Sequence, residues 1–161
     1  MYESFDDMPE NARVWVYQSN RKLNEQELAS IDQAANQFVD SWEAHGAPLR
    51  ASYKLLHDQF LIILVDESFN SASGCSIDAS VHFIQKIEKD LDLNFFDRSK
   101  VAFIYKNEVF LESLNDLKLK VSEGVIDENT LTFNNLIQYK KELEQAWLLP
   151  AGKTWLGRYF N

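Results

Sequence analysis

The sequence has little cysteine, glycine and proline. Its 161 residues include one cysteine, five glycines and three prolines. A single cysteine cannot form an internal disulfide, so nothing indicates an oxidising compartment. Because few glycines and prolines leave little room for long linkers, we expect residues 1–161 to form a single domain.

Signals for export and for membrane insertion are also missing. The first residues, MYESFDDMPENAR, are acidic and lack the apolar stretch of a signal peptide. The longest apolar run is FLIILV at 60–65, far shorter than the ~20 residues of a membrane helix. We therefore expect a cytoplasmic protein that does not enter a membrane.

Positive charge is scarce as well. The chain has 16 Lys and Arg against 25 Asp and Glu, a formal net charge of −9. Since nucleic-acid backbones and anionic membranes attract cationic proteins, we expect neither as a partner. A local basic patch would escape this argument. The C-terminal region offers one, diluted by Glu142 and Glu144, in Lys140, Lys141, Lys153 and Arg158.

Apolar and aromatic residues, in contrast, are plentiful enough for one substantial core. Hydrophobic residues make up 45% of the chain, with 11 Phe, 4 Trp and 6 Tyr. Their spacing predicts strands at 12–18, 49–56, 60–66 and 100–105. It predicts one helix from the N-cap Asn24 to Gly46, with Glu27 completing a capping box, and a second at about 77–91. The run 60–65 does not alternate, so we expect it to be covered on both faces.

The order strand, helix, strand, strand, helix, strand is that of the ferredoxin-like, or split βαβ, arrangement. We therefore predict an α+β fold: a ferredoxin-like βαββαβ core at about 12–105 with a four-stranded antiparallel sheet and both helices on one face. Residues 106–161 form a C-terminal α/β extension that covers the other face. There we expect a helix at 114–122 ending at Gly124, a strand at TLTF, and a helix carrying Leu136, Tyr139, Leu143 and Trp147.

The only cysteine lies in SASGCSIDAS, residues 71–80, where a helix is expected to begin with Ser76 as N-cap. Three interpretations remain open: Cys75 is a small buried residue at a tight turn, part of an anion-binding corner, or a nucleophile. A helix N-terminus favours anions and lowers a thiol pKa, and Gly74 permits close approach. The candidate ligand-binding residues are Ser73, Gly74, Cys75, Ser76 and Asp78, with Asp66, Asn134 and Asn135, and with Arg98 or Arg158 supplying charge.

Motifs for catalysis and for cofactors are lacking. No G-x-x-x-x-G-K-[ST] is present, and the GKT at 152–154 has Trp147 where the first glycine would stand. The histidines, His45, His57 and His82, do not have the spacing of a zinc site. Asp66, Glu67 and Asp78 could together hold a magnesium ion, but acidic capping is the simpler interpretation. We predict no metal, no cofactor and no catalytic residues, and we lean against an enzyme.

Several words of the sequence carry a resemblance: ARVWVYQ, HGAPLRASY, SGCSID, FNNL and the ending W…PAGKTW…R. They resemble a family of short uncharacterised proteins of Bacteroidota that often bear the label ABC transporter ATPase. The resemblance implies a bacterial, cytoplasmic protein. Since the chain lacks a transporter ATPase's phosphate loop, it implies no activity and no catalytic residues.

Two functions follow as hypotheses. The first is a non-catalytic binding or interaction protein with an unknown protein partner or self-association, because no catalytic motif is present while Trp15, Trp42, Trp147, Trp155 and Tyr159 are available for contacts. The second is a small-molecule or anion-binding protein, either a pure binder or an enzyme, with its site at Ser73–Asp78.

Overall fold

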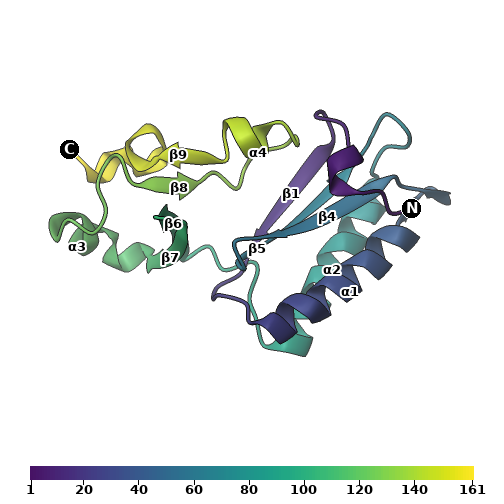
Figure 1. The fold of residues 1–161 in the computed structure, drawn as a ribbon, viewed down its shortest axis with the longest axis horizontal. Coiled ribbons are helices and arrows are strands. Elements are labelled where there is room, and N and C mark those ends of the chain that lie inside the picture. The colour runs from purple at the N-terminus through teal and green to yellow at the C-terminus, as the bar shows by residue number, and fades with distance from the viewer.

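The computed structural model describes all residues, Met1–Asn161, and shows an α+β protein with two larger antiparallel sheets and one small two-stranded sheet (Figure 1). The first sheet has the order β1-β5-β4, with β1 at Arg13–Gln18, β4 at Ala51–Leu56 and β5 at Phe60–Val65. A three-residue turn at His57, Asp58 and Gln59, the first two at positive φ, joins β4 to β5. The three predicted strands of this sheet are confirmed.

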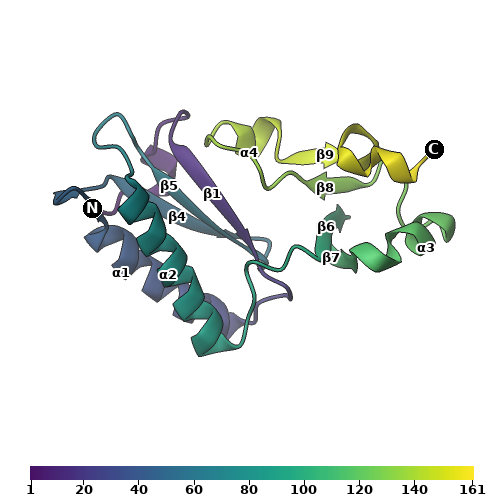
Figure 2. The same cartoon turned by 180° about the vertical axis from the view of Figure 1, so that it is seen from behind.

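Two long helices, α1 at Glu25–Ser41 and α2 at Gly74–Leu91, lie side by side on one face of this sheet (Figures 1 and 2). Their buried faces meet Leu61, Ile63 and Val65 of β5 in a cluster of 16 buried residues. Asn24 caps α1, and Glu27 completes the predicted capping box. None of the helices is both long and apolar enough to span a bilayer.

The strand β5 is buried at every position, as its unbroken apolar sequence predicts. Its odd-numbered residues face the helices. Phe60, Ile62 and Leu64 face the opposite way, into a second cluster shared with Phe133 and Trp147 of the C-terminal region. The C-terminal region therefore covers the face of the first sheet that the helices leave bare, as predicted.

The second sheet has the order β7-β6-β8-β9. Its strands are β6 at Lys100–Tyr105, β7 at Glu108–Ser113, β8 at Leu131–Phe133 and β9 at Leu148–Pro150. A tight turn at Lys106 and Asn107, both at positive φ, joins β6 to β7. In Figure 1 this sheet lies in the green and yellow part of the molecule, on the opposite side of the first sheet from the helices α1 and α2.

The prediction that residues 100–105 form the fourth strand of the first sheet is wrong. The order β1-β5-β4 corresponds to three strands of the ferredoxin-like sheet, but β6 pairs with β7 and β8 and the ferredoxin-like topology is not evident. Two features explain the difference. First, a hairpin with a two-residue turn pairs all six residues of β6 with β7. Second, β6 has apolar residues on both faces, and the second sheet buries the two faces in separate clusters.

Helix boundaries differ from the prediction at two places. The helix α1 ends at Ser41 with Trp42 as C-cap, whereas Gly46 turns a small hairpin between β2, Glu43–Ala44, and β3, Ala47–Pro48, at φ 76°. The helix α2 begins at Gly74 with Ser73 as N-cap and Ser76 completing a capping box. The predicted start at residue 77 is therefore three residues late.

The C-terminal region contains less helix than its periodicity suggests. The segment 114–122 is the predicted helix, starting as the 3-10 helix Leu114–Asp116 and continuing as α3, Leu117–Ser122. The expected helix over 134–147 is reduced to α4, Glu142–Gln145. Its apolar residues Ile137 and Trp147 instead fill the second cluster from an irregular segment. Three further 3-10 helices lie at Phe5–Asp7, Ala151–Lys153 and Trp155–Tyr159.

The outer edge of β1 is only partly covered. In β1 the backbone N–H and C=O groups of the odd-numbered residues bond to β5, as the Ser19 N–H to Gln59 carbonyl bond of 2.8 Å indicates. The backbone N–H and C=O groups of the even-numbered residues therefore face the outer edge of the sheet. The Val14 N–H donates to the Gln138 carbonyl at 2.9 Å. The N–H and C=O of Val16 have no partner within the chain.

Side-chain amides join the two sheets at the end of β1. The Asn135 Nδ2 donates to Gln18 Oε1 at 2.9 Å, while its Oδ1 accepts from the Trp147 indole at 3.0 Å. Gln18 in turn donates to the Lys100 carbonyl at 3.3 Å. This chain of hydrogen bonds connects β1, the start of β6 and the segment before α4.

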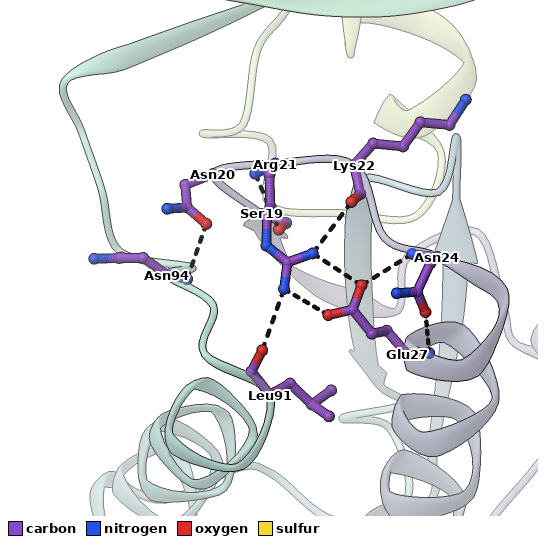
Figure 3. Close-up of polar contacts among 8 residues, drawn as sticks. All are labelled: Ser19, Asn20, Arg21, Lys22, Asn24, Glu27, Leu91 and Asn94. Atoms are coloured by element: carbon purple, nitrogen blue, oxygen red, sulfur yellow. Dashed lines mark hydrogen bonds and ion pairs between the residues drawn. The ribbon is translucent and has the colours of Figure 1, made fainter.

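A second polar network holds the loop after β1 against both helices (Figure 3). The Arg21 guanidinium donates two hydrogen bonds to the Glu27 carboxylate, at 2.9 and 2.6 Å, and one to the Leu91 carbonyl at the end of α2, at 3.2 Å. Figure 3 also shows the Asn20 side chain accepting from the Asn94 N–H. These contacts fix where the chain leaves α2 on its way to β6.

Candidate functional site

The sequence Ser73–Asp78 forms the cap and first turn of α2, and none of its residues lines any of the five main cavities of the molecule. Cys75 is exposed; the interpretation that it is a buried residue at a tight turn is therefore wrong. The Ser73 hydroxyl oxygen accepts from the Ser76 N–H at 3.1 Å, and the Ser76 hydroxyl oxygen accepts from the Ser73 N–H at 2.7 Å. The capping box thus accounts for both serines.

The acidic residues near this turn are engaged elsewhere. Asp66 is buried, accepts from the Ser68 hydroxyl at 2.6 Å and pairs with Arg50 at 3.3 Å. Glu67 accepts from the Ala72 N–H at 3.0 Å and lies 3.7 Å from Arg13. No group of three potential metal-ligating side chains forms here or elsewhere in the molecule.

Asn134 and Asn135, the remaining predicted residues, lie in a different place. Together with Arg98, they line a cavity of about 370 Å³ at the junction of the two sheets. The structure therefore brings together the amides and one cation named from the sequence, but at the second sheet and apart from the α2 N-terminus. A volume of this size is within the range of small-molecule sites.

Three segments of the second sheet and one residue of the first build this cavity. The chain entering β6 contributes Arg98 and Lys100, and the end of β8 contributes Thr132 and Phe133 with the two asparagines that follow. The turn after β9 adds Lys153, Thr154 and Trp155. From the first sheet, Gln18 reaches the wall at the end of β1.

The turn after β9 depends on Gly152. Its N–H donates to the Glu128 carbonyl at 2.8 Å, and a Cβ at this position would come within 2.8 Å of the Glu128 Cβ. Glycine therefore lets the GKT segment pass directly over the loop before β8. The 3-10 helix that contains Gly152, Ala151–Lys153, and the next one, Trp155–Tyr159, place Lys153 and Trp155 at the cavity.

The charge of the cavity is opposite to that of the whole chain. Arg98, Lys100 and Lys153 line it, and no carboxylate residue does. None of the three cations lies within 4.0 Å of a carboxylate oxygen. The neighbouring Asp97 carboxylate accepts hydrogen bonds from the hydroxyl group and the backbone N–H of Ser99. These hydrogen bonds, together with the positive charge of the nearby Lys100, lower the pKa of Asp97.

Some polar groups of the cavity are committed to the fold and others are free. Thr132 donates to the Ala102 carbonyl and Thr154 to the Ala151 carbonyl, both at 2.8 Å, and Asn135 holds Gln18 and Trp147. Asn134 accepts from the Leu136 N–H at 3.2 Å, which leaves its Nδ2 donor without a partner. Lys100 donates to the Asn20 carbonyl at 3.3 Å. The side-chain groups without a hydrogen-bond partner are those of Arg98 and Lys153 and the Asn134 Nδ2; all are donors, and an acceptor-rich ligand suits them.

The lining contains no histidine, cysteine, aspartate or glutamate. General acid–base catalysis draws mostly on these residues, and hard metal ions are held by carboxylates. The cations and amides that line the cavity offer positive charge and hydrogen-bond donors to an anion.

Two other cavities have mixed charge. One, of about 530 Å³, follows the outer edge of β1, where Arg13 is already paired with Glu67 and lies 4.9 Å over the Trp15 ring. Another, of about 440 Å³, combines Lys22 and His57 with Asp58 and Glu108. Neither gathers unpaired charges of one sign.

Comparisons with known proteins give no family for the chain. No family model matches it, and no curated protein or solved structure gives a significant match. The geometry of the cavity is therefore the basis of the functional argument.

Sequence reasoning missed Lys100 and Trp155 as part of one site and placed Lys153 only in a general basic face. The signal in the sequence is a pair of short basic segments, RSK at 98–100, which follows Asp97, and GKTW at 152–155, which has no acidic neighbour. Since these segments are about 50 residues apart in the sequence, only their meeting in the second sheet reveals a shared site.

Proposed function

We propose that this protein is a non-catalytic binding protein whose basic cavity holds the anionic group of a small molecule. One observation carries the proposal: Arg98, Lys100 and Lys153 line one cavity without a carboxylate partner in a chain of net charge −9. Grouping like charges costs free energy. An anion between them would offset that cost and use the free donor of Asn134.

The matching experiment is calorimetric titration with inorganic phosphate and ribose 5-phosphate, with the uncharged sugar ribose as control ligand. We expect both phosphates to bind and ribose not to bind. A hydrogen bond to a charged group contributes about 1.5–3 kcal/mol, so Lys153→Ala and Arg98→Ala should each weaken binding by roughly tenfold or more.

Lys86→Ala is the control variant, since Lys86 is an exposed lysine of α2 outside the cavity. It removes the same charge and should leave the affinity for phosphate within about twofold, because exposed charges at a distance are screened by salt. Failure of both phosphates to bind, or an equal loss in all three variants, would contradict the proposal.

A second candidate function, self-association, is favoured by the outer edge of β1. Val16 presents a free N–H and a free C=O there, and Leu136, 87% exposed, lies beside it. An edge with both groups on one residue can pair antiparallel with a second copy. Light scattering tests this: a dimer that Val16→Pro converts to a monomer supports the idea, whereas a monomer at high concentration rules it out.

A further inference from the structure

One aromatic side chain distinguishes the basic cavity from a simple phosphate site. Trp155 lines it and is 55% exposed. In contrast, Trp42 and Trp147 are each 3% exposed. A tryptophan left this open at a cavity is unusual, because the indole ring is among the largest apolar surfaces that a chain can bury.

The indole is held in place by its neighbours. The Arg158 guanidinium lies 5.4 Å from the ring centroid, and the Tyr159 ring meets it edge-on at 6.4 Å. Leu156, next in the chain, is buried in the third core cluster and anchors the turn. Trp155 therefore presents a fixed flat surface, which loses little conformational freedom when another ring stacks on it.

Resting on the function proposed above, we propose that the cavity takes a phosphate monoester carried on a flat aromatic ring, the chemistry of a nucleoside monophosphate. The phosphate lies among Arg98, Lys100 and Lys153, and the ring stacks on Trp155. The free Nδ2 of Asn134 donates to an acceptor of the ligand. Stacking and charge are then supplied by separate residues of one cavity.

Size and charge favour a monophosphate over a longer phosphate chain. The cavity, about 370 Å³, is near the lower end of the range for small-molecule pockets, so one ring and one phosphate fill it. The net charge of −9 over the whole chain also disfavours a ligand that carries more negative charge than the three cations can balance.

The experiment compares adenosine monophosphate, uridine monophosphate and ribose 5-phosphate by calorimetric titration. All three carry the same sugar phosphate, and only the first two carry a ring. Base–aromatic stacking is worth about 1–3 kcal/mol per base, which is roughly a fivefold to hundredfold gain in affinity. We expect adenosine monophosphate to bind at least tenfold more tightly than ribose 5-phosphate, with uridine monophosphate between them.

The readout is the ratio of the affinities for adenosine monophosphate and ribose 5-phosphate. In Trp155→Leu we expect the ratio to fall to near one, whereas Trp155→Phe, which keeps a ring, should retain most of it. Lys153→Ala should weaken both ligands together and leave the ratio unchanged. Circular dichroism and thermal melting verify that each variant is folded.

The outcomes separate the two proposals. If ribose 5-phosphate binds as tightly as adenosine monophosphate, or if the ratio survives in Trp155→Leu, the stacking role is overturned while the anion site stands. If neither phosphate binds, the anion site itself is overturned. A ratio above ten that Trp155→Leu abolishes supports the assignment.

Discussion

The two sheets of this protein differ in whether their arginines have carboxylate partners. Around the first sheet the arginines are paired: Arg13 with Glu67, Arg21 with Glu27 and Arg50 with Asp66. In the second sheet and its C-terminal turns, Arg98, Lys153 and Arg158 have no carboxylate partner. The paired arginines of the first sheet serve the fold, and the unpaired cations Arg98 and Lys153 are the ones that line the cavity proposed above to bind an anion.

The two sheets also differ in what covers them. The first sheet has two long, well-capped helices on one face and the second sheet's residues on the other. The second sheet contributes to that shared cluster and otherwise relies on short helical turns around a cluster of five buried residues. We therefore expect the first sheet to be the more stable part and the second to depend on it.

The largest expected effect is at the shared cluster. Phe60 is fully buried, with its ring 4.5 Å from Phe133 and 5.0 Å from Trp147. Phe60→Ala should lower the free energy of unfolding by about 3–5 kcal/mol, measured by urea denaturation. Phe69→Ala, at a side chain 61% exposed, should change it little. Separate transitions for the two sheets in the wild-type protein would contradict the shared core.

The amide connection between the sheets should have the next largest effect. In Asn135→Ala the Trp147 indole N–H, in a side chain 3% exposed, loses its acceptor. An unsatisfied buried donor costs about 1–3 kcal/mol, again measured by urea denaturation. Asn115→Ala is the control, because Asn115 is exposed and its side chain makes no hydrogen bond. An equal effect of both substitutions would argue against the connection.

A smaller effect, confined to the first sheet's helices, is expected at the α1 cap. The Asn24 side chain accepts from the Glu27 N–H at 2.8 Å, and Asn24→Ala should cost about 1 kcal/mol. Binding of phosphate should be unchanged, since Asn24 does not line the cavity. A loss of phosphate affinity in this variant would show that the two parts are energetically coupled.

The same cap predicts a dependence on acid. The hydrogen bonds from Arg21, followed by that from the Asn24 backbone, lower the pKa of Glu27. A carboxyl whose folded pKa is depressed contributes stability above its unfolded pKa, 4.5, and this contribution is lost as the pH falls through the folded value. Glu27→Gln should reduce the slope of stability against pH below about 4.5, measured by urea denaturation.

The smallest effect is expected at His57, in the turn between β4 and β5. Burial against Phe133 and Trp147 lowers the pKa of its imidazole below 6.5. Because the unfolded chain then binds the proton more readily, stability should fall as the pH drops below about 6.5 and level off below the folded pKa. His57→Asn, which tolerates the positive φ of 56°, should flatten the profile between pH 7 and 5.

The sequence predicted the parts of the fold that local patterns determine. The strands 13–18, 51–56 and 60–65 and the capping box at Asn24 follow from alternation, apolar runs and cap residues. The pairing partner of β6 could not be predicted from these local patterns, because Val101–Ile104 has the sequence of a buried strand that fits either sheet. The competing hairpin with β7 decides between the two sheets. The segment 134–147 has helical spacing, but burial of Trp147 and the hydrogen bonds of Asn135 outweigh it.

The candidate site was predicted only in fragments. Asn134, Asn135 and Arg98 were named, yet they were placed beside Cys75 because a glycine before a helix suggested an anion site there. The capping box between Ser73 and Ser76 explains that pattern locally. The cations of the actual cavity come from separate segments of the chain, and their proximity is a property of the tertiary structure.

The incompletely paired edge of β1 has a consequence for biosynthesis. The first sheet and its helices are complete by Leu91, so they can form while Gln138, which bonds to Val14, is still on the ribosome. During that interval the outer edge of β1 can pair with a neighbouring nascent chain. Edge-to-edge aggregation then competes with completion of the fold. Slow translation after residue 91 would lengthen this exposure.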